Sequence, residues 1–185
     1  EHKCVLNTAI EIAQNTNIKL HILKVNCFGL IDLKELSEIL KNLEGKTLVS
    51  IMHANNETGS IIDINKIGEI CKQNDALFHS DTVQTIAHYP FDVQKTNVDF
   101  LSGSAHKFHG PKGVGFLYMK QKTKVKALIN GGGQERNYRS GTENLLSILA
   151  MEKALEISVA NMNTWKKHIL DLKFYFKSKL ENEID

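Results

Sequence analysis

The chain has 185 residues, of which 42% are hydrophobic and 24% charged, and its formal net charge is +2. These proportions are ordinary for a globular protein and exclude wholesale disorder. The near-balance of charge gives no electrostatic case for nucleic acid or an anionic membrane as a partner. No apolar run approaches the roughly 18–20 residues of a membrane span, and the opening residues, EHKCVLNT, have no apolar signal core.

The three cysteines, Cys4, Cys27 and Cys71, are scattered along the chain. Their odd number argues against a disulfide framework, and no Cys/His spacing suggests a metal site. We therefore expect no metal, three structural cysteines and a reducing, cytoplasmic compartment. The chain opens with Glu1 rather than Met and closes inside a helix-like stretch, so we also expect a fragment of a longer protein.

Apolar periodicity predicts alternating helices and strands along the first part of the chain. In chain order the pattern predicts a helix at 4–14, a strand at 21–25, a helix at 32–43, a strand at 47–54, a helix at 64–74 and strands at 76–83, 98–104 and 114–120. Asp32 is a plausible N-cap, with Glu35 as its capping-box partner. The alternation predicts an α/β fold with a mainly parallel sheet flanked by helices.

A glycine-rich segment at 129–144 precedes a charged helical stretch that runs from Leu145 to the end. That stretch reads as one long helix or a broken pair. It is the only candidate boundary, so we divide the chain into a domain at 1–144 and a helical segment at 145–185.

Polar residues gather directly after three of the predicted strands, at 53–59, 81–84 and 104–107. Ligands of α/β sheets bind outside the carboxyl ends of the strands. The coincidence predicts one active site at that edge.

Lys107 lies in the small-residue context SGSAHKFHGPKG, where the backbone can approach a ligand closely. A partly desolvated lysine loses its proton readily and can act as a Schiff-base nucleophile. An isolated lysine is usually a surface residue, but this context favours the nucleophile. Asp81 could pair with a protonated pyridine nitrogen, and Gln84 and Asn56 could bind the same ring. The simpler interpretations are a helix N-cap or a turn for Asp81 and a turn before the helix at 64 for Asn56.

Two further features are less informative on their own. The segment from Gly131 to Thr142 could bind an anion through its backbone N–H groups, or it could be a flexible surface loop. His2 and His53 have no clear role by themselves. We interpret three other histidines as packing residues: His21, His88 and His168.

Five motifs together resemble the NifS/IscS-type cysteine desulfurases, which are pyridoxal-phosphate (PLP) enzymes of fold type I in the class V aminotransferase superfamily. The motifs are EHKCVLNT, VSIMHANNETG, FHSDTVQ, SGSAHKFHGPKGVGFLY and GGGQERNYRSGTEN. They occur in the family's order between Glu1 and about Ala150. The resemblance implies that residues 1–144 are an incomplete large PLP-binding domain.

The resemblance also implies roles by position. Lys107 matches the lysine that binds PLP covalently, and Asp81 matches the carboxylate that faces the pyridinium nitrogen. Gln84 and Asn56 match residues on the ring's oxygen side.

Other positions match contacts at the edges of the cofactor. Ser104 and His106 match phosphate contacts, and His2 matches an imidazole that stacks on the ring and helps proton transfer. Thr142 matches a residue that reaches the phosphate of a neighbouring subunit, which implies a homodimer with shared active sites.

The implied reaction removes sulfur from L-cysteine, releases L-alanine and leaves an enzyme persulfide. The sulfur then passes to an iron–sulfur scaffold protein or a tRNA-thiolation relay. The chain departs from the family in lacking a phosphate-binding turn before Glu1 and a C-terminal small domain with the persulfide cysteine, which none of its three cysteines matches.

Two alternatives remain open at this point. Another class V PLP enzyme, such as an aminotransferase, would share Asp81 and Lys107 but need no persulfide cysteine. A non-catalytic dimerisation or interaction module would need neither residue, and the intact set of site residues weighs against it.

Overall fold

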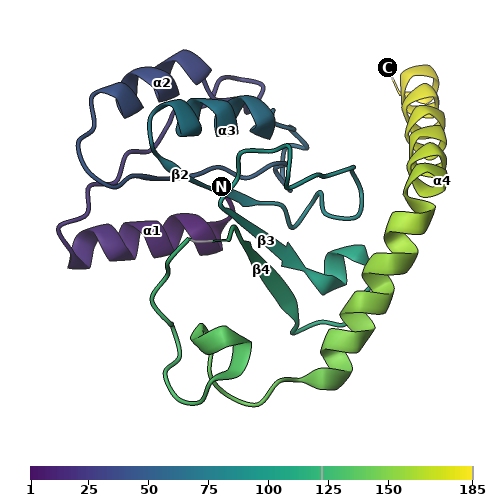
Figure 1. The fold of residues 1–185 in the computed structure, drawn as a ribbon. Coiled ribbons are helices and arrows are strands. Elements are labelled where there is room, and N and C mark those ends of the chain that lie inside the picture. The colour runs from purple at the N-terminus through teal and green to yellow at the C-terminus, as the bar shows by residue number, and fades with distance from the viewer. Residues whose placement is uncertain (122, 185) are drawn as a thin grey trace.

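Four strands form one sheet in the computed structural model, which describes residues 1–121 and 123–184 (Figure 1). The strand order is β1-β2-β3-β4, and each neighbour in space is also the next strand along the chain. β1 pairs with β2 and β2 with β3 in parallel, whereas β3 and β4 are antiparallel. The predicted α/β fold with a mainly parallel sheet is confirmed. The bounds are β1 Leu48–Ser50, β2 Leu77–Asp81, β3 Phe100–Ser104 and β4 Gly115–Met119.

Helices pack on the sheet and beside its end (Figure 1). α2 packs against α3, and α3 packs against β2. The last helix, α4, is one continuous helix of 39 residues rather than a broken pair. The final residue of the predicted helical segment, Asp185, lies outside the described residues. The α-helices are α1 Lys3–Asn15, α2 Leu33–Lys41, α3 Ile64–Gln73 and α4 Leu145–Glu183, and the 3₁₀ helices are η1 Ala105–Phe108 and η2 Gln134–Asn137.

Side-chain caps explain where α2 and α3 begin. The Asp32 carboxylate accepts a hydrogen bond from the Lys34 N–H at 2.8 Å. Asp63 does the same for the Lys66 N–H at 3.2 Å. Each carboxylate satisfies one of the N–H groups that a helix start leaves without an intrahelical partner. The predicted N-cap at Asp32 is confirmed.

The main core lies between the sheet and the two capped helices. Phe78 of β2 and Ile67 of α3 are fully buried, and Leu101 of β3 is 2% exposed. Leu36 and Leu40 add the buried face of α2. Burying each such side chain contributes roughly 1.5–3 kcal/mol, so this cluster is what holds the strand ends in place.

A second, smaller core joins α4 to the chain that follows β3. Ala105 and Phe108 of η1 are fully buried, and Ala87 is 5% exposed. Met151 and Leu155, from the first half of α4, pack against them. Lys107 therefore lies on a turn that is wedged between the sheet and α4.

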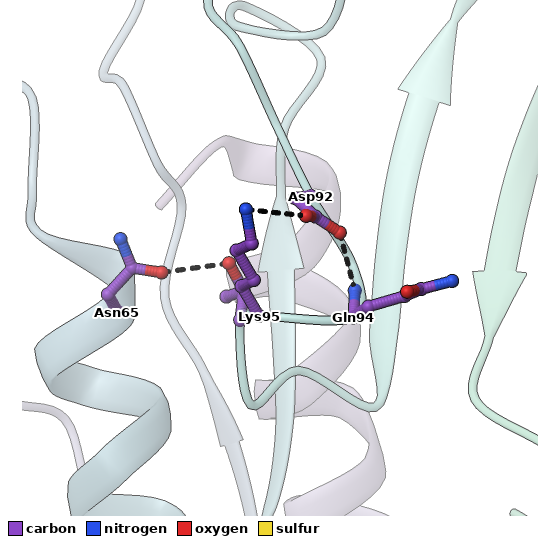
Figure 2. Close-up of polar contacts among 5 residues, drawn as sticks. Asn65, Asp92, Gln94 and Lys95 are labelled. Atoms are coloured by element: carbon purple, nitrogen blue, oxygen red, sulfur yellow. Dashed lines mark hydrogen bonds and ion pairs between the residues drawn. The ribbon is translucent and has the colours of Figure 1, made fainter.

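A hydrogen bond fastens the connection from β2 to β3 to α3, and two further polar contacts lie within the connection itself (Figure 2). The Thr96 hydroxyl donates a hydrogen bond to the Asn65 side-chain oxygen at 2.8 Å. Asp92 accepts a hydrogen bond from the Gln94 N–H at 2.9 Å and pairs with Lys95 at 3.4 Å. The exposed ion pair adds little stability, and it is the partly buried hydrogen bond of Thr96 that reaches α3.

The strand expected at 21–25 is wrong. That segment forms only an isolated bridge between Val25 and Ile31, across a turn that the Asn26 side chain stabilises. A strand needs a neighbouring edge to pair with, and apolar residues in a short run do not supply one. Among the described residues, no helix is both long and apolar enough to cross a bilayer.

Candidate functional site

Asp81 ends β2, at the carboxyl edge of the sheet, and is only 6% exposed. Its carboxylate accepts a hydrogen bond from the Val83 N–H at 2.9 Å. Within residues 1–121 and 123–184, no cationic side chain forms an ion pair with it. A buried carboxylate without a cation is costly unless a ligand provides one. Asp81 is therefore well suited to face a positively charged group.

The chain leaves β3, the strand next to Asp81, directly into the lysine turn, by which we mean residues 104–110. The Ser104 hydroxyl and the His106 Nδ1 lie 2.9 Å apart. Lys107 follows on η1, and the residue is exposed. The partial desolvation expected for Lys107 is therefore not provided by the described residues of this chain. His109, the residue directly after η1, adopts the left-handed conformation, with φ of 68°.

The segment after β1 stays attached to β2 beyond the end of the strand. The His53 N–H donates a hydrogen bond to the Asp81 carbonyl at 2.9 Å. The Asn55 side-chain oxygen then accepts hydrogen bonds from the backbone N–H groups of Glu57 and Thr58, which closes a tight turn. Asn56 is exposed at that turn, and its amide donates to Glu57 at 2.7 Å. The Asn55 side chain thus stabilises the turn, whereas the Asn56 side chain is accessible to a ligand at the edge of the site.

The start of α1 reaches the same edge. The Glu1 carboxylate accepts a hydrogen bond from the Met52 N–H, just after β1. Burial raises the pKa of Glu1, and the nearby negative charge of Asp81 acts in the same direction. His2 caps α1 by accepting a hydrogen bond from the Cys4 N–H at 3.2 Å. The first turn of α1 therefore brings His2 to the side of the sheet where Asp81 ends β2.

Gln84 lies three residues after Asp81 in a half-buried turn and lines a cavity of about 540 Å³ beside α4. Thr142 is different, because it is exposed in the loop between η2 and α4. No hydrogen bond or ion pair among the described residues joins Thr142 to the other candidates. The expectation that it serves a neighbouring subunit stays a prediction.

A comparison with models of protein families finds one match, and it covers the whole chain. The family model described as aminotransferase class-V matches residues 1–185. The chain belongs to this family. Its relatives include proteins named cysteine desulfurase IscS from Dictyoglomus turgidum, 41% identical over 100% of this chain, and from Clostridium botulinum, 44% identical over 88% of it.

Solved structures of the family agree with the fold. A NifS-like protein from Rickettsia africae has a TM-score of 0.92 and 35% identity over 100% of this chain and 50% of its own. The chain covers 46% of the Dictyoglomus relative and 40% of the Clostridium one. It therefore spans about half the length of the curated relatives it matches.

One polar network in this class V chain was not predicted from the sequence. His79 on β2 lies between two hydroxyls, with Nδ1 2.8 Å from Ser50 Oγ of β1 and Nε2 2.8 Å from Ser102 Oγ of β3. Burial lowers the pKa of His79, while the charge of Asp81 opposes that shift. The period of two along a strand places His79 on the same face as Asp81, and this was the signal available in the sequence.

Two further histidines have partners that the sequence did not reveal. His53 Nδ1 lies 2.9 Å from the Thr85 hydroxyl, and burial lowers the pKa of this histidine. The His88 ring contacts the backbone of Lys107, so His88 is more than the packing residue we expected. His21 and His168 are exposed rather than packed.

Each cysteine is of interest in a chain related to cysteine desulfurases. Cys71 is buried in the main core, and burial raises the pKa of its thiol to about 12. That residue is structural, as expected. Cys4 and Cys27 are free thiols at the surface, so packing does not explain them.

Proposed function

We propose that the intact protein is a PLP-dependent cysteine desulfurase that takes sulfur from L-cysteine, releases L-alanine and retains the sulfur as a persulfide. The observation that carries this proposal is the meeting of Asp81 and the lysine turn on neighbouring strands of the sheet. β2 and β3 are paired so that Asp81 lies opposite Ser102, two residues before the turn begins. The names of the curated relatives, cysteine desulfurase, are the basis for proposing L-cysteine as the substrate.

The chemistry of the residues at this edge fits PLP. Asp81 is a buried carboxylate with no ion-pair partner among the described residues, which suits a protonated ring nitrogen. Lys107 provides a primary amine on the adjacent turn. Ser104 and His106, 2.9 Å apart, provide a hydroxyl and an imidazole that suit a phosphate.

When bound, PLP supplies an electron sink for bond breaking next to the amino group of cysteine. Lys107 would hold the cofactor and move a proton at its Nζ atom. Asp81 would keep a proton on the ring nitrogen by offering a fixed negative charge. The proposed roles of the two residues therefore differ, and substitutions should separate them.

The other residues would orient the cofactor. We assign Gln84 and Asn56 to the oxygen side of the ring, and His2 to its face and to proton transfer. Thr142 would contact the phosphate in a neighbouring subunit, which requires a homodimer.

The proposal extends to the domains and to sulfur acceptors. Residues 1–144 would form part of a large PLP-binding domain, and 145–185 would lead toward a small domain. In support, the distal half of α4 exposes Phe174 and Phe176, each 64% exposed. The acceptor would be an iron–sulfur scaffold or a sulfur-relay protein. The free cysteines fit a reducing, cytoplasmic compartment.

The test uses the intact protein with its native cofactor. Borohydride reduction followed by peptide mapping should find a pyridoxyl group on Lys107. Lys107→Ala should lose this adduct and the visible absorbance of bound PLP, and lower alanine production from cysteine by at least about 100-fold. Lys112→Ala, five positions further along the same motif, SGSAHKFHGPKG, and also exposed, is the matched control and should behave like the unmodified protein.

The alternatives give different results in the same experiment. Asp81→Ala should retain part of the PLP absorbance and lose most turnover, and unchanged turnover would remove Asp81 from the mechanism. A PLP adduct on Lys107 with no alanine formed from cysteine would indicate another class V enzyme. Absence of PLP from the intact protein would indicate a non-catalytic module.

A further inference from the structure

His88 holds the backbone of Lys107. Its Nε2 atom lies 2.9 Å from the Lys107 carbonyl oxygen, although the two residues are 19 positions apart. Because a carbonyl oxygen only accepts, His88 must carry its proton on Nε2. This contact is a hydrogen bond from a side chain to the main chain of the proposed PLP lysine.

The end of a short helix explains why the Lys107 carbonyl needs a partner. η1 ends at Phe108, so its last carbonyl groups have no intrahelical N–H group to accept from. The Ala105 carbonyl is satisfied by the Gly110 N–H at 2.8 Å, and the Phe108 carbonyl by the Ser158 hydroxyl at 3.2 Å. His88 supplies the missing donor for Lys107.

His88 belongs to the same turn as Gln84. The Ile86 N–H bonds to the Thr82 carbonyl at 2.9 Å, and the His88 N–H bonds to the Thr85 carbonyl at 3.0 Å. These bonds close two successive turns over residues 82–88. Gln84 and His88 both line the cavity beside α4, so the two residues lie on one side of the turn.

The turn itself is held firmly. The Thr85 hydroxyl lies 2.9 Å from His53 Nδ1, which anchors the turn to the segment after β1. Ala87 is 5% exposed and adopts a left-handed φ of 64°, which only tight surroundings maintain in a residue other than glycine. His88 thus approaches Lys107 from a rigid support.

We propose that His88 is a positioning residue that sets the distance between Gln84 and Lys107, so that both reach one PLP molecule. This inference rests on the proposed function. His88 touches neither substrate nor cofactor in this role, and it acts only through the main chain of Lys107. Loss of its N–H donor would let the lysine turn shift while leaving Lys107 itself intact.

The test compares His88→Leu with His88→Gln in the intact protein, since glutamine keeps an N–H donor and leucine does not. PLP affinity is measured by absorbance titration of the cofactor-free protein. The rate at which Lys107 captures PLP is measured by borohydride trapping and peptide mass. His88→Leu should weaken affinity about five- to tenfold and slow capture, and His88→Gln should stay within about twofold of the unmodified protein. His21→Leu, at an exposed site, is the control.

The outcomes separate the role of His88 from the proposed function. If the unmodified protein places PLP on Lys107 and His88→Leu does so equally well, the role of His88 is disproved and the proposed function stands. Equal defects in the leucine and glutamine variants would show that His88 acts by packing alone, which also disproves its role. If the unmodified protein takes up no PLP, both proposals fail.

A measurement without substitutions covers the case in which His88→Leu does not fold. Nitrogen NMR of the intact, unmodified protein reports which ring nitrogen of His88 carries the proton. The hydrogen bond to the Lys107 carbonyl requires a proton on Nε2. A neutral ring protonated on Nδ1 alone would overturn the proposal.

Discussion

Ser158 of α4 donates a hydrogen bond from its hydroxyl to the carbonyl oxygen of Phe108, 3.2 Å away on the lysine turn. Ser158 is 1% exposed, so this bond is shielded from water. Together with the packing of His109 against Trp165, whose ring centroids are 5.1 Å apart, it attaches α4 to the residues that follow Lys107. The long helix therefore supports the site directly.

Ser158→Ala should lower the free energy of unfolding by about 1–3 kcal/mol, because it leaves the Phe108 carbonyl buried without a donor. Ser178→Ala, at an exposed position of the same helix, should change it by no more than about 0.5 kcal/mol. Urea unfolding of the two variants measures the difference. Equal values for the two would mean that the Ser158 hydrogen bond does not anchor α4.

Gly68→Ala should destabilise the protein even though alanine is the better helix former. A Cβ atom at position 68 of α3 would lie 2.5 Å from the Asn97 carbonyl oxygen, which is backbone and cannot rotate away. The resulting strain, about 1–3 kcal/mol, exceeds the roughly 1 kcal/mol gain in helix propensity. Glu69→Ala, exposed on the same helix, is the control for thermal unfolding. A rise in the melting temperature of the Gly68 variant would contradict the close approach of α3 to Asn97.

Stability should fall as the pH drops below the ordinary histidine pKa of 6.5, because burial lowers the pKa of His79 in the folded state. Between that lowered pKa and 6.5 the unfolded chain binds more protons than the folded one, so protons favour unfolding. Below the lowered pKa both states are protonated and the loss levels off.

Urea unfolding between about pH 7.5 and about pH 5 measures this slope. His79→Gln should reduce the slope, whereas His21→Gln, at an exposed position, should leave it unchanged. Burial also lowers the pKa of His53, so part of the slope should remain in the His79 variant. An identical slope in the His79 variant would mean that this histidine is not buried in its neutral form.

Alkylation in native buffer near neutral pH should modify Cys4 and Cys27 but not Cys71. The first two are exposed, whereas Cys71 is 1% exposed and its thiol has a pKa raised to about 12, so almost none of it is thiolate. Intact mass and peptide mapping count the modified sites, and unfolding in urea should add the third. Modification of Cys71 in native buffer would show that the main core opens readily.

Local signals in the sequence predicted local structure well. Asp32 caps α2 because a carboxylate and the N–H two residues later are always within reach of each other at a helix start. The segment at 21–25 shows the limit, because Ile22, Leu23 and Val25 give it the apolar character of a strand, yet it forms none. A strand is completed by an edge elsewhere in the chain, and residues 21–25 pair with none beyond the bridge of Val25 to Ile31.

The candidate site likewise combines features that local sequence predicts with features that depend on contacts between distant residues. The sequence by itself determined which residues we propose for the chemistry, since Asp81 and Lys107 stand in motifs whose order and spacing can be read along the chain. Only the tertiary structure decided which side chains support them, as in the contact of His88 with Lys107 or of His79 with Ser50. Such pairs are 19 and 29 residues apart, and no periodicity spans that distance. They form only once the burial of the core has closed the loops between the strands and brought the strand ends together.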